Sequence, residues 1–169
     1  QKEKKKTNKF YTLPNNSFDE SYKSKVRKIV SNLKIKGADY QFITASENNA
    51  WLLNIRGADS KYTPIPHSYT LIDQKKNIFF FCDLKKISPS FKKKFDKFKL
   101  FDIKFTNQIL SKIKKKKIII DRNTCSIYFE NIILKNNTIN NDHDCIYLLK
   151  AIKTKKEIEN IKKAHIYDG

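Results

Sequence analysis

Residues 51–59 contain the residue types in this chain that are best suited to shaping a binding loop. They include the only tryptophan and one of three arginines, whereas almost all other basic residues are lysine. Next to Gly57, the permanently charged Arg56 could hold a carboxylate or a backbone carbonyl of a ligand. Alternatively, Arg56 could pair with Asp59 and only shape the loop. The sequence leaves both interpretations open.

Four potential metal ligands follow one another in Asn141-Asp142-His143-Asp144-Cys145. Zinc sites usually take ligands roughly two to five residues apart, together with a second pair elsewhere in the chain. Adjacent residues cannot all point at one ion without strain. We therefore favour a solvated turn over a metal site.

Three further candidates lack a chemical partner. His67 could act as a general base or contact a substrate, but a structural loop histidine is favoured, because no carboxylate or nucleophile lies at a recognisable spacing. His165 is expected at a surface or an interdomain contact. The four lysines at 114–117 could clamp phosphate, yet charges before a buried strand more often keep that strand soluble. No phosphate-binding loop, dinucleotide fingerprint or nucleophile-elbow motif is present, so nothing here makes a complete active site.

Periodic spacing of apolar residues predicts the elements that would position these groups. Helices are predicted from a cap at Ser17 or Asp19 to about Lys36, then at 47–54, from Pro89 with an inward stripe of Phe91, Phe95 and Phe98, and at 106–112, 124–134 and 154–166. Strands are predicted at 40–45, 69–73, 77–82, 100–105 and 117–121.

Several details of these elements matter for the fold. Gly37 is suited to ending the first helix, and the second helix delivers Arg56 into a loop. Segment 124–134 fits a strand or a helix, and we favour a helix packed on a sheet through Ile127, Phe129, Ile132 and Ile133. Segment 136–144 is polar and turn-like. Alternating elements predict an α/β fold, a mixed β-sheet flanked by helices on both faces with one antiparallel hairpin.

Length and composition set the class of protein. A chain of 169 residues is long enough for one domain without a metal or disulfide staple. Cys82 and Cys125 lie in apolar runs and are expected to be small buried hydrophobes in a reducing compartment. No apolar run approaches the ~20 residues of a membrane span, and no signal peptide is recognisable. We expect a cytoplasmic protein without a membrane partner.

The formal net charge of +19, from 36 basic and 17 acidic residues, is typical of proteins that bind nucleic acid. However, Lys, Asn, Ile and Phe make up about half of the chain and all have A/T-rich codons, so mutational bias can supply the lysines. Lysine occurs in every segment, and arginine, the usual reader of bases, is scarce. We therefore favour other functions over nucleic-acid binding.

A resemblance to a known family rests on Trp51-Leu52-Leu53-Asn54-Ile55-Arg56-Gly57-Ala58-Asp59, followed by residues 63–66 and the strand at 68–72. These residues resemble the second domain of three-domain Xaa-Pro aminopeptidases (aminopeptidase P), a creatinase/prolidase N-terminal-type domain. Gly37-Ala38-Asp39 and the closing segments 149–158 and 164–169 fit in order. Family members usually carry arginine where this chain has Tyr167.

The resemblance implies a domain plan: residues 1–14 as a linker from a preceding domain, 15–150 as the creatinase/prolidase N-terminal-type domain, and 151–169 as the linker and first helix of a catalytic domain. The chain has no methionine, and we expect it to be an excised piece of a longer protein.

The family implies a metallopeptidase that removes the N-terminal residue preceding proline, using two divalent metal ions, commonly manganese. The family's metal ligands lie beyond Gly169, so no catalytic or metal-binding residue is transferred to this chain. The resemblance gives this piece a supporting role, with Asn54, Arg56 and Asp59 in a loop that controls substrate access.

Two alternatives and the expected partners complete the interpretation. The chain could instead be a free-standing basic α/β module that binds nucleic acid, or a creatinase-like binding module whose metal site has decayed. Under the favoured interpretation, its partners are the flanking domains of the same polypeptide, the proline-containing peptide substrates and, as a further expectation, a second copy in a homodimer.

Overall fold

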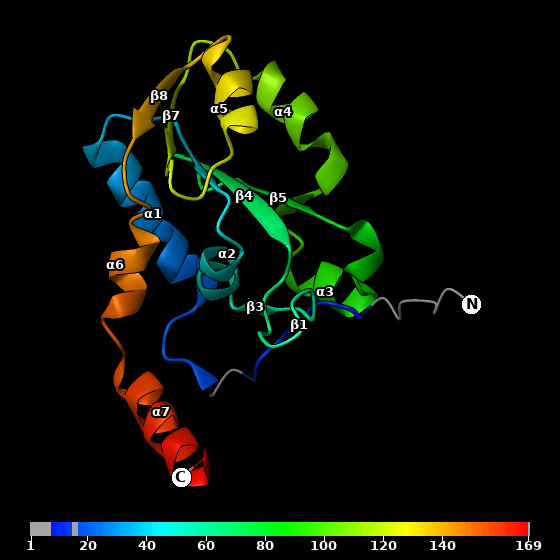
Figure 1. The fold of residues 1–169 in the computed structure, drawn as a ribbon, viewed down its shortest axis with the longest axis vertical. Helices are drawn as coiled ribbons and strands as arrows, with labels where there is room; N and C mark the ends of the chain where they lie inside the picture. The colour runs from blue at the N-terminus through cyan, green and yellow to red at the C-terminus, as the bar shows by residue number, and fades with distance from the viewer. Residues whose placement is uncertain (1–7, 15–16, 169) are drawn as a thin grey trace.

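A six-stranded mixed sheet forms the middle layer of the structure, a computed structural model that describes residues 8–14 and 17–168 (Figure 1). The strand order is β6-β5-β4-β2-β7-β8. Strand β4 runs antiparallel to both of its neighbours, whereas the β5–β6, β2–β7 and β7–β8 pairs are parallel. The strands are β2 (Tyr40–Ile43), β4 (Ser68–Asp73), β5 (Ile78–Cys82), β6 (Phe98–Asp102), β7 (Lys117–Ile120) and β8 (Thr138–Asn141).

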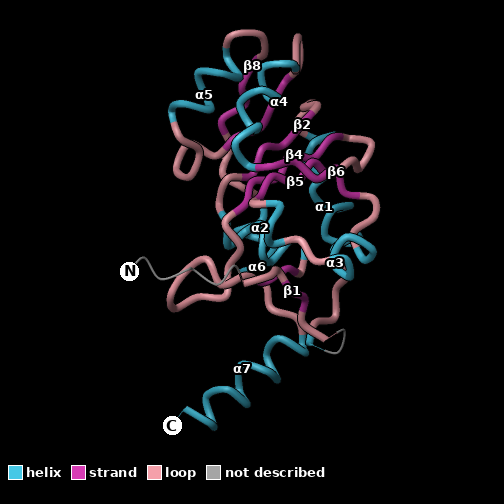
Figure 2. The backbone as a smooth tube through the Cα atoms, turned by 90° about the vertical axis from the view of Figure 1, so that its right-hand side faces the viewer, coloured by secondary structure: helices cyan, strands magenta, loops and turns pink. Residues whose placement is uncertain are grey.

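Helices cover both faces of this sheet, which confirms the predicted α/β fold (Figures 1 and 2). One face carries α1 (Tyr22–Ile35), α2 (Ser46–Leu53), α3 (Pro89–Lys94) and α6 (Ile146–Ala151), and the other carries α4 (Thr106–Lys112) and α5 (Ile127–Leu134). Helix α7 (Lys155–Asp168) projects from the body in both views. Single 3-10 turns, η2 (Leu84–Lys86) and η3 (Ile103–Phe105), follow β5 and β6. Within the described residues, no helix is long and apolar enough to cross a membrane.

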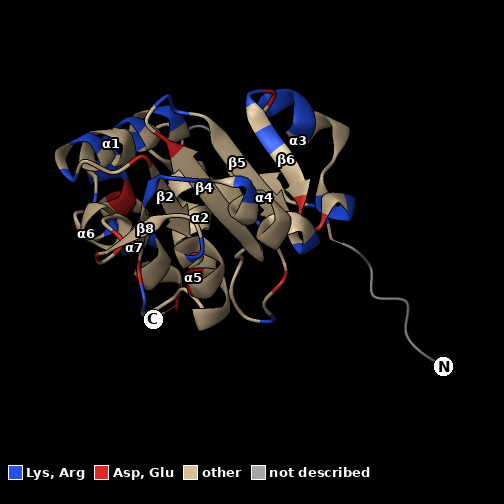
Figure 3. Ribbon diagram, turned by 90° about the horizontal axis from the view of Figure 1, so that it is seen from above, with Lys and Arg blue, Asp and Glu red and all other residues tan. Residues whose placement is uncertain are grey.

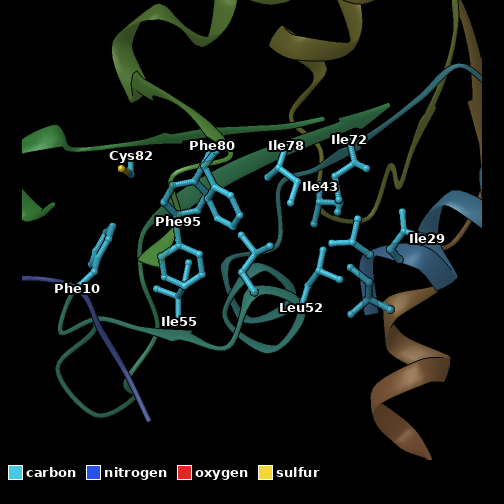
Figure 4. Close-up of a cluster of buried hydrophobic side chains, with 14 of the residues drawn as sticks. Phe10, Ile29, Ile43, Leu52, Ile55, Ile72, Ile78, Phe80, Cys82 and Phe95 are labelled. Carbon is cyan, nitrogen blue, oxygen red and sulfur yellow. The ribbon is translucent and has the colours of Figure 1, made fainter. Parts of the chain in front are cut away.

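Two hydrophobic layers result from the period of two along each strand. Phe80 and Ile72 are fully buried in the layer beneath α1, α2, α3 and α6, which Figure 4 shows in close-up. Their chain neighbours Phe81 and Leu71 are equally buried in the layer beneath α4 and α5. Because both faces are covered, the strands read as continuous apolar runs. Cys82 and Cys125 are buried as predicted, and burial raises the pKa of each thiol to about 12.

The helix ends follow local capping rules, with one correction. Ser21 caps α1 by accepting a hydrogen bond from the Ser24 amide at 3.3 Å, so neither Ser17 nor Asp19 is the cap. Gly37 ends the helix at a φ of 58°, as predicted. Helix α7 opens with the predicted reciprocal pair, in which the Thr154 amide donates to Glu157 Oε2 and the Glu157 amide donates to Thr154 Oγ1.

Two segments that were predicted to be irregular belong to the folded body instead. Segment 136–144, predicted as a turn, contains β8, which is polar because it is an edge strand with a single neighbour. Residues 10–12, expected within a linker, contribute the buried Phe10 and the strand β1 (Tyr11–Thr12), which pairs with β3 (Ile55–Arg56). Residues 1–7 of that expected linker lie outside the described residues. Ile127 of α5, predicted to face the sheet, is 68% exposed.

Asp144 provides a buried polar connection between α6 and the rest of the domain. It is 4% exposed, and its two carboxylate oxygens accept hydrogen bonds from Gln41 Nε2 at 2.9 Å and Asn48 Nδ2 at 2.7 Å. Its amide donates to Asp121 Oδ2 at 2.9 Å. Burial raises the pKa of Asp144, because the low-dielectric surroundings disfavour the charged form. The interpretation of this stretch as a solvated turn was therefore wrong at Asp144.

We expect Asp144→Ala to destabilise the domain more than a typical surface substitution. It would leave the amides of Gln41 and Asn48 buried without an acceptor, at about 1–3 kcal/mol for each. The measurement is the free energy of unfolding in urea. Asp142→Ala is the matched control, since it removes only a partly exposed ion pair with Lys36, and should cost at most about 1 kcal/mol. Equal losses for the two variants would contradict a structural role for Asp144.

Candidate functional site

A left-handed turn at Asn54 sets the course of segment 51–59. Helix α2 stops there because Asn54 adopts φ 54° and ψ 36°, a conformation that asparagine tolerates better than most residues. Its amide donates to the carbonyls of Ala50 and Trp51, which satisfies the end of the helix. The chain then reverses into β3 and pairs with β1, so Ile55 and Arg56 lie in a short strand and not in the predicted loop.

Lys25 of α1 stabilises this turn through hydrogen bonds. Its ammonium group donates to the Trp51 carbonyl at 2.8 Å and to Asn54 Oδ1 at 2.7 Å, and it lies 4.0 Å from the centroid of the Trp51 ring. Asn54 Nδ2 completes the set by donating to the Glu20 carbonyl at 3.0 Å. Lys25 is 3% exposed, and burial lowers its pKa to about 8. The side chains of Asn54 and Lys25 are thus occupied inside the domain.

Arg56 likewise bonds to backbone groups of its own domain. Its Nη1 donates to the carbonyls of Ala50 and Ile55, both at 3.0 Å. The guanidinium is half-buried, and burial lowers its pKa. The sequence left open whether Arg56 pairs with Asp59, and the structure shows no such pair among the described residues.

Asp59 instead joins two segments that are distant in sequence. Its Oδ2 accepts the His67 amide at 2.7 Å, and its Oδ1 forms an ion pair with Lys86 of η2. The Asp59 carboxylate therefore links the two ends of segment 57–67 to each other and to η2. The His67 ring is exposed and packs edge-on against Tyr69 at 5.8 Å, and no carboxylate of residues 8–14 or 17–168 forms a hydrogen bond with it.

Gly57 allows the segment to close tightly. Its amide donates to the Pro64 carbonyl at 3.3 Å. A Cβ atom at this position would lie 2.9 Å from Pro66 Cα and 3.1 Å from the Phe10 ring. Only glycine permits this approach without a backbone shift. The stiff Pro-containing stretch and the glycine therefore form one packed unit with β1.

A cavity of about 310 Å³ lies between Trp51 with the start of α1 and the chain leading into α7. Trp51, Lys25 and Glu20 line one side, and Leu149, Ile152 and Glu157 line the other. Trp51 Nε1 is buried and finds no acceptor among the described residues. Segment 51–59 is thus adjacent to the exit of the chain toward α7.

The remaining candidates do not assemble into a reactive site. His143 is exposed on the surface, 3.9 Å from Asp121, and His165 is exposed on α7. Of the four lysines at 114–117, Lys116 pairs with Asp39 and Lys117 Nζ donates to the Lys36 carbonyl. Residues 8–14 and 17–168 contain no group of three or more His, Cys, Asp or Glu side chains that could hold a metal ion.

Lys25 is the residue that sequence reasoning missed. A lysine in a helix is normally assigned to the solvated face, but Lys25 lies three residues after Tyr22 and four before Ile29, on the apolar stripe of α1. A charge on that stripe predicts a buried partner, and this signal could have identified it.

Comparison with protein-family models matches residues 1–157 to the creatinase/prolidase N-terminal domain. Among curated proteins, the chain is 31% identical over 153 residues to Xaa-Pro aminopeptidase 1 of Dictyostelium discoideum, which covers 86% of this chain and 23% of the relative. It is also 31% identical over 144 residues to the Xaa-Pro aminopeptidase ApepP of Drosophila melanogaster, covering 81% of this chain and 23% of that protein. The chain thus spans about a quarter of the length of these relatives.

Solved structures share the fold. An X-prolyl aminopeptidase from Caenorhabditis elegans, described as a cytosolic enzyme with a di-nuclear active site, superposes with a TM-score of 0.83 at 21% identity, covering 94% of this chain and 27% of that chain. A prolidase from Pyrococcus horikoshii gives a TM-score of 0.55 at 19% identity, covering 83% of this chain and 38% of that chain.

We expect Lys25→Met to destabilise the domain by about 1–3 kcal/mol at neutral pH, because Asn54 Oδ1 and the Trp51 carbonyl lose their donor. The pH dependence provides a second signature. Between pH 8 and 10.5 the unfolded chain keeps the Lys25 proton that the folded chain has lost, so the stability of the wild type rises with pH relative to the variant. Both effects can be measured by urea unfolding from pH 7 to 10.5.

Lys28→Met is the matched control, one turn further along the same helix. Lys28 forms a partly exposed ion pair with Glu20, so its loss should cost at most about 1 kcal/mol and leave the wild-type pH dependence in place. If Lys25→Met behaved like this control, Lys25 would not be what holds the turn.

Proposed function

This chain belongs to the creatinase/prolidase N-terminal domain family, and from that premise we propose that it is a non-catalytic domain of a metal-dependent Xaa-Pro aminopeptidase. Such an enzyme removes the N-terminal residue that precedes proline. The observation that carries the proposal is the match over 86% of this chain to one quarter of a curated Xaa-Pro aminopeptidase. The activity therefore belongs to a longer polypeptide that contains this domain.

The metal ions of the proposed enzyme lie outside this chain. The described residues hold no cluster of ligands suited to two divalent ions, and several of the carboxylates that are present form structural contacts. Asp144 and Asp59 are examples, since both bind backbone and side-chain donors within the domain. We expect manganese in a catalytic domain of the longer polypeptide, and a cytoplasmic location like that of the Caenorhabditis elegans neighbour, which is described as cytosolic.

Within this enzyme, segment 51–59 would act on substrate access through its shape. Asn54 and Arg56 are bound to groups of their own domain, so these side chains brace the segment and leave little capacity for a ligand. Asp59 closes segment 57–67 at the surface. In Figure 1, β1 and β3 lie in the half of the molecule from which α7 projects, which supports a position of this segment near the exit toward α7.

The partners of the proposed domain follow from this arrangement. Flanking domains of the same polypeptide would contact the end of the molecule that carries β1, β3 and α7, and proline-containing peptides would be the substrates of the whole enzyme. The proposal also includes a homodimer, but it assigns no surface of the domain to that contact.

We expect a longer polypeptide containing this domain to release the first residue of an Xaa-Pro-Xaa tripeptide in the presence of Mn²⁺, and the 169-residue chain alone to be inactive. The assay is chromatographic detection of the released amino acid, with an Xaa-Ala-Xaa tripeptide as the substrate control. Activity of the 169-residue chain, or equal cleavage of both tripeptides by the longer polypeptide, would refute the assignment.

The access role is tested in the same longer polypeptide with Asp59→Ala. This substitution removes the contacts of the Asp59 carboxylate with the His67 amide and with Lys86. The ratio of kcat/KM for a tripeptide to that for a decapeptide should change, while Asp142→Ala, at an ion pair on β8's side of the domain, should leave it unchanged. An unchanged ratio for Asp59→Ala would remove the access role and leave the family assignment intact.

A further inference from the structure

A second cavity, distant in sequence from segment 51–59, is lined by five basic side chains and by no acidic one. Its volume is about 550 Å³, and it lies between α1, the turn that joins β4 to β5, and the start of β6. The basic residues are Lys23, Arg27, Lys75, Lys76 and Lys97.

Three elements bring these charges together. Lys23 and Arg27 are four residues apart on α1 and so lie on one face of the helix. In the parallel pair of β5 and β6, Ile78 is opposite Phe98, which places the preceding turn residues Lys75 and Lys76 beside Lys97. The cluster therefore depends on the sheet register and could not be read from the lysine-rich sequence.

The five cations around the cavity have no ionic partner among the described residues. Elsewhere Lys28 pairs with Glu20, Lys36 with Asp142 and Lys116 with Asp39. In the described part of the chain, none of the five side chains around the cavity forms an ion pair, a hydrogen bond or a ring contact. Figure 3 shows Lys and Arg on α1 and α3 and in many loops, so the unusual feature is the absence of acidic neighbours, and not the presence of lysine.

Two acidic residues lie close to this cavity in sequence but do not line it. Asp73, at the end of β4, accepts hydrogen bonds from the amides of Lys75 and Asn77 and from the Asn77 side chain, and thus builds the turn. Asp96 precedes Lys97 but does not line the cavity. No carboxylate therefore forms part of the cavity wall, although burial and the nearby Asp96 raise the pKa of Tyr22 in that wall.

The floor of the cavity is apolar and well packed. Tyr22 meets Phe98 edge-on, with ring centroids 5.5 Å apart, and Val26 and Ile78 are buried beside them. The five charged residues around this floor are exposed to solvent. The floor also gives a bound molecule a surface for a non-phosphate portion.

We propose that this cavity binds a small ligand that carries two or more phosphoryl groups. Lysine binds phosphate as a point charge, and several lysines with one arginine around a single cavity match an anion of high charge density. The volume falls within the range of about 300–1,000 Å³ that is typical of small-molecule sites. Single-stranded nucleic acid needs a groove that follows several nucleotides, whereas these cations converge on one cavity. This inference goes beyond the proposed peptidase role and does not depend on it.

Isothermal titration of the 169-residue chain with inorganic pyrophosphate and tripolyphosphate, at about 150 mM KCl to screen weak surface contacts, tests the proposal. The triple variant Arg27→Gln, Lys75→Gln and Lys97→Gln removes one cation from each of the three elements. We expect the affinity of the variant to fall by about tenfold or more, because each substitution removes a charge that attracts the phosphoryl oxygens. Circular dichroism checks that the variant is folded.

The matched control is Lys112→Gln, Lys114→Gln and Lys135→Gln. It removes the same number of positive charges, at exposed positions around α4 and α5. It should retain the wild-type affinity. Equal losses in both variants would show that only net charge matters, and no heat of binding in the wild type would also overturn the proposal. Tighter binding of a hexaglutamate peptide or of oligo(dT) would reassign the cavity to an acidic peptide or to nucleic acid.

Discussion

A buried lysine beneath a left-handed turn is the constraint on which the candidate site depends. Lys25 cannot remain buried without acceptors, and it finds them in the Trp51 carbonyl and Asn54 Oδ1. These same contacts fix the end of α2, direct β3 toward β1, and bring Gly57 against Pro66 and Phe10. The rare residues of segment 51–59 therefore serve mainly to hold a shape. This occupation of the polar side chains agrees with the non-catalytic role that we propose for the domain.

Much of the fold followed from the sequence because the physical signals were local. Two strand segments separated by only three residues, 74–76, predicted the β4–β5 hairpin, and the reciprocal pair of Thr154 and Glu157 marked the start of α7. Strand β8 was missed because its residues are mostly polar. It lies at the edge of the sheet, where its side chains are exposed or only partly buried. Lys25 and Asp144 were misjudged for a common reason: residue type predicts exposure, whereas their partners, some more than 90 residues away in the case of Asp144, make burial tolerable. Likewise, Asp59 pairs with Lys86 through tertiary structure and not with the nearby Arg56.

Charge has separate roles in different parts of this strongly basic chain. Lys25 is buried and forms hydrogen bonds within the domain, whereas Lys116 and Lys36 pair with carboxylates at the surface. The five cations around the second cavity come together through the fold, on a cavity wall that contains no acidic side chain. Codon bias can supply many lysines, but it does not place five basic side chains around one cavity. The two cavities thus lead to different hypotheses, one about support for a peptidase and one about an anionic ligand.

Hydrogen exchange in segment 54–67 tests the central claim most directly. In the structure the Gly57 amide donates to the Pro64 carbonyl and the His67 amide donates to Asp59, so both are held by contacts within the domain. If the segment is a rigid structural unit, these two amides should exchange slowly, in the same range as strand amides of β4, and Lys25→Met should accelerate them selectively. Exchange as fast as that of an unprotected loop in the wild type, or no acceleration in Lys25→Met, would contradict the account.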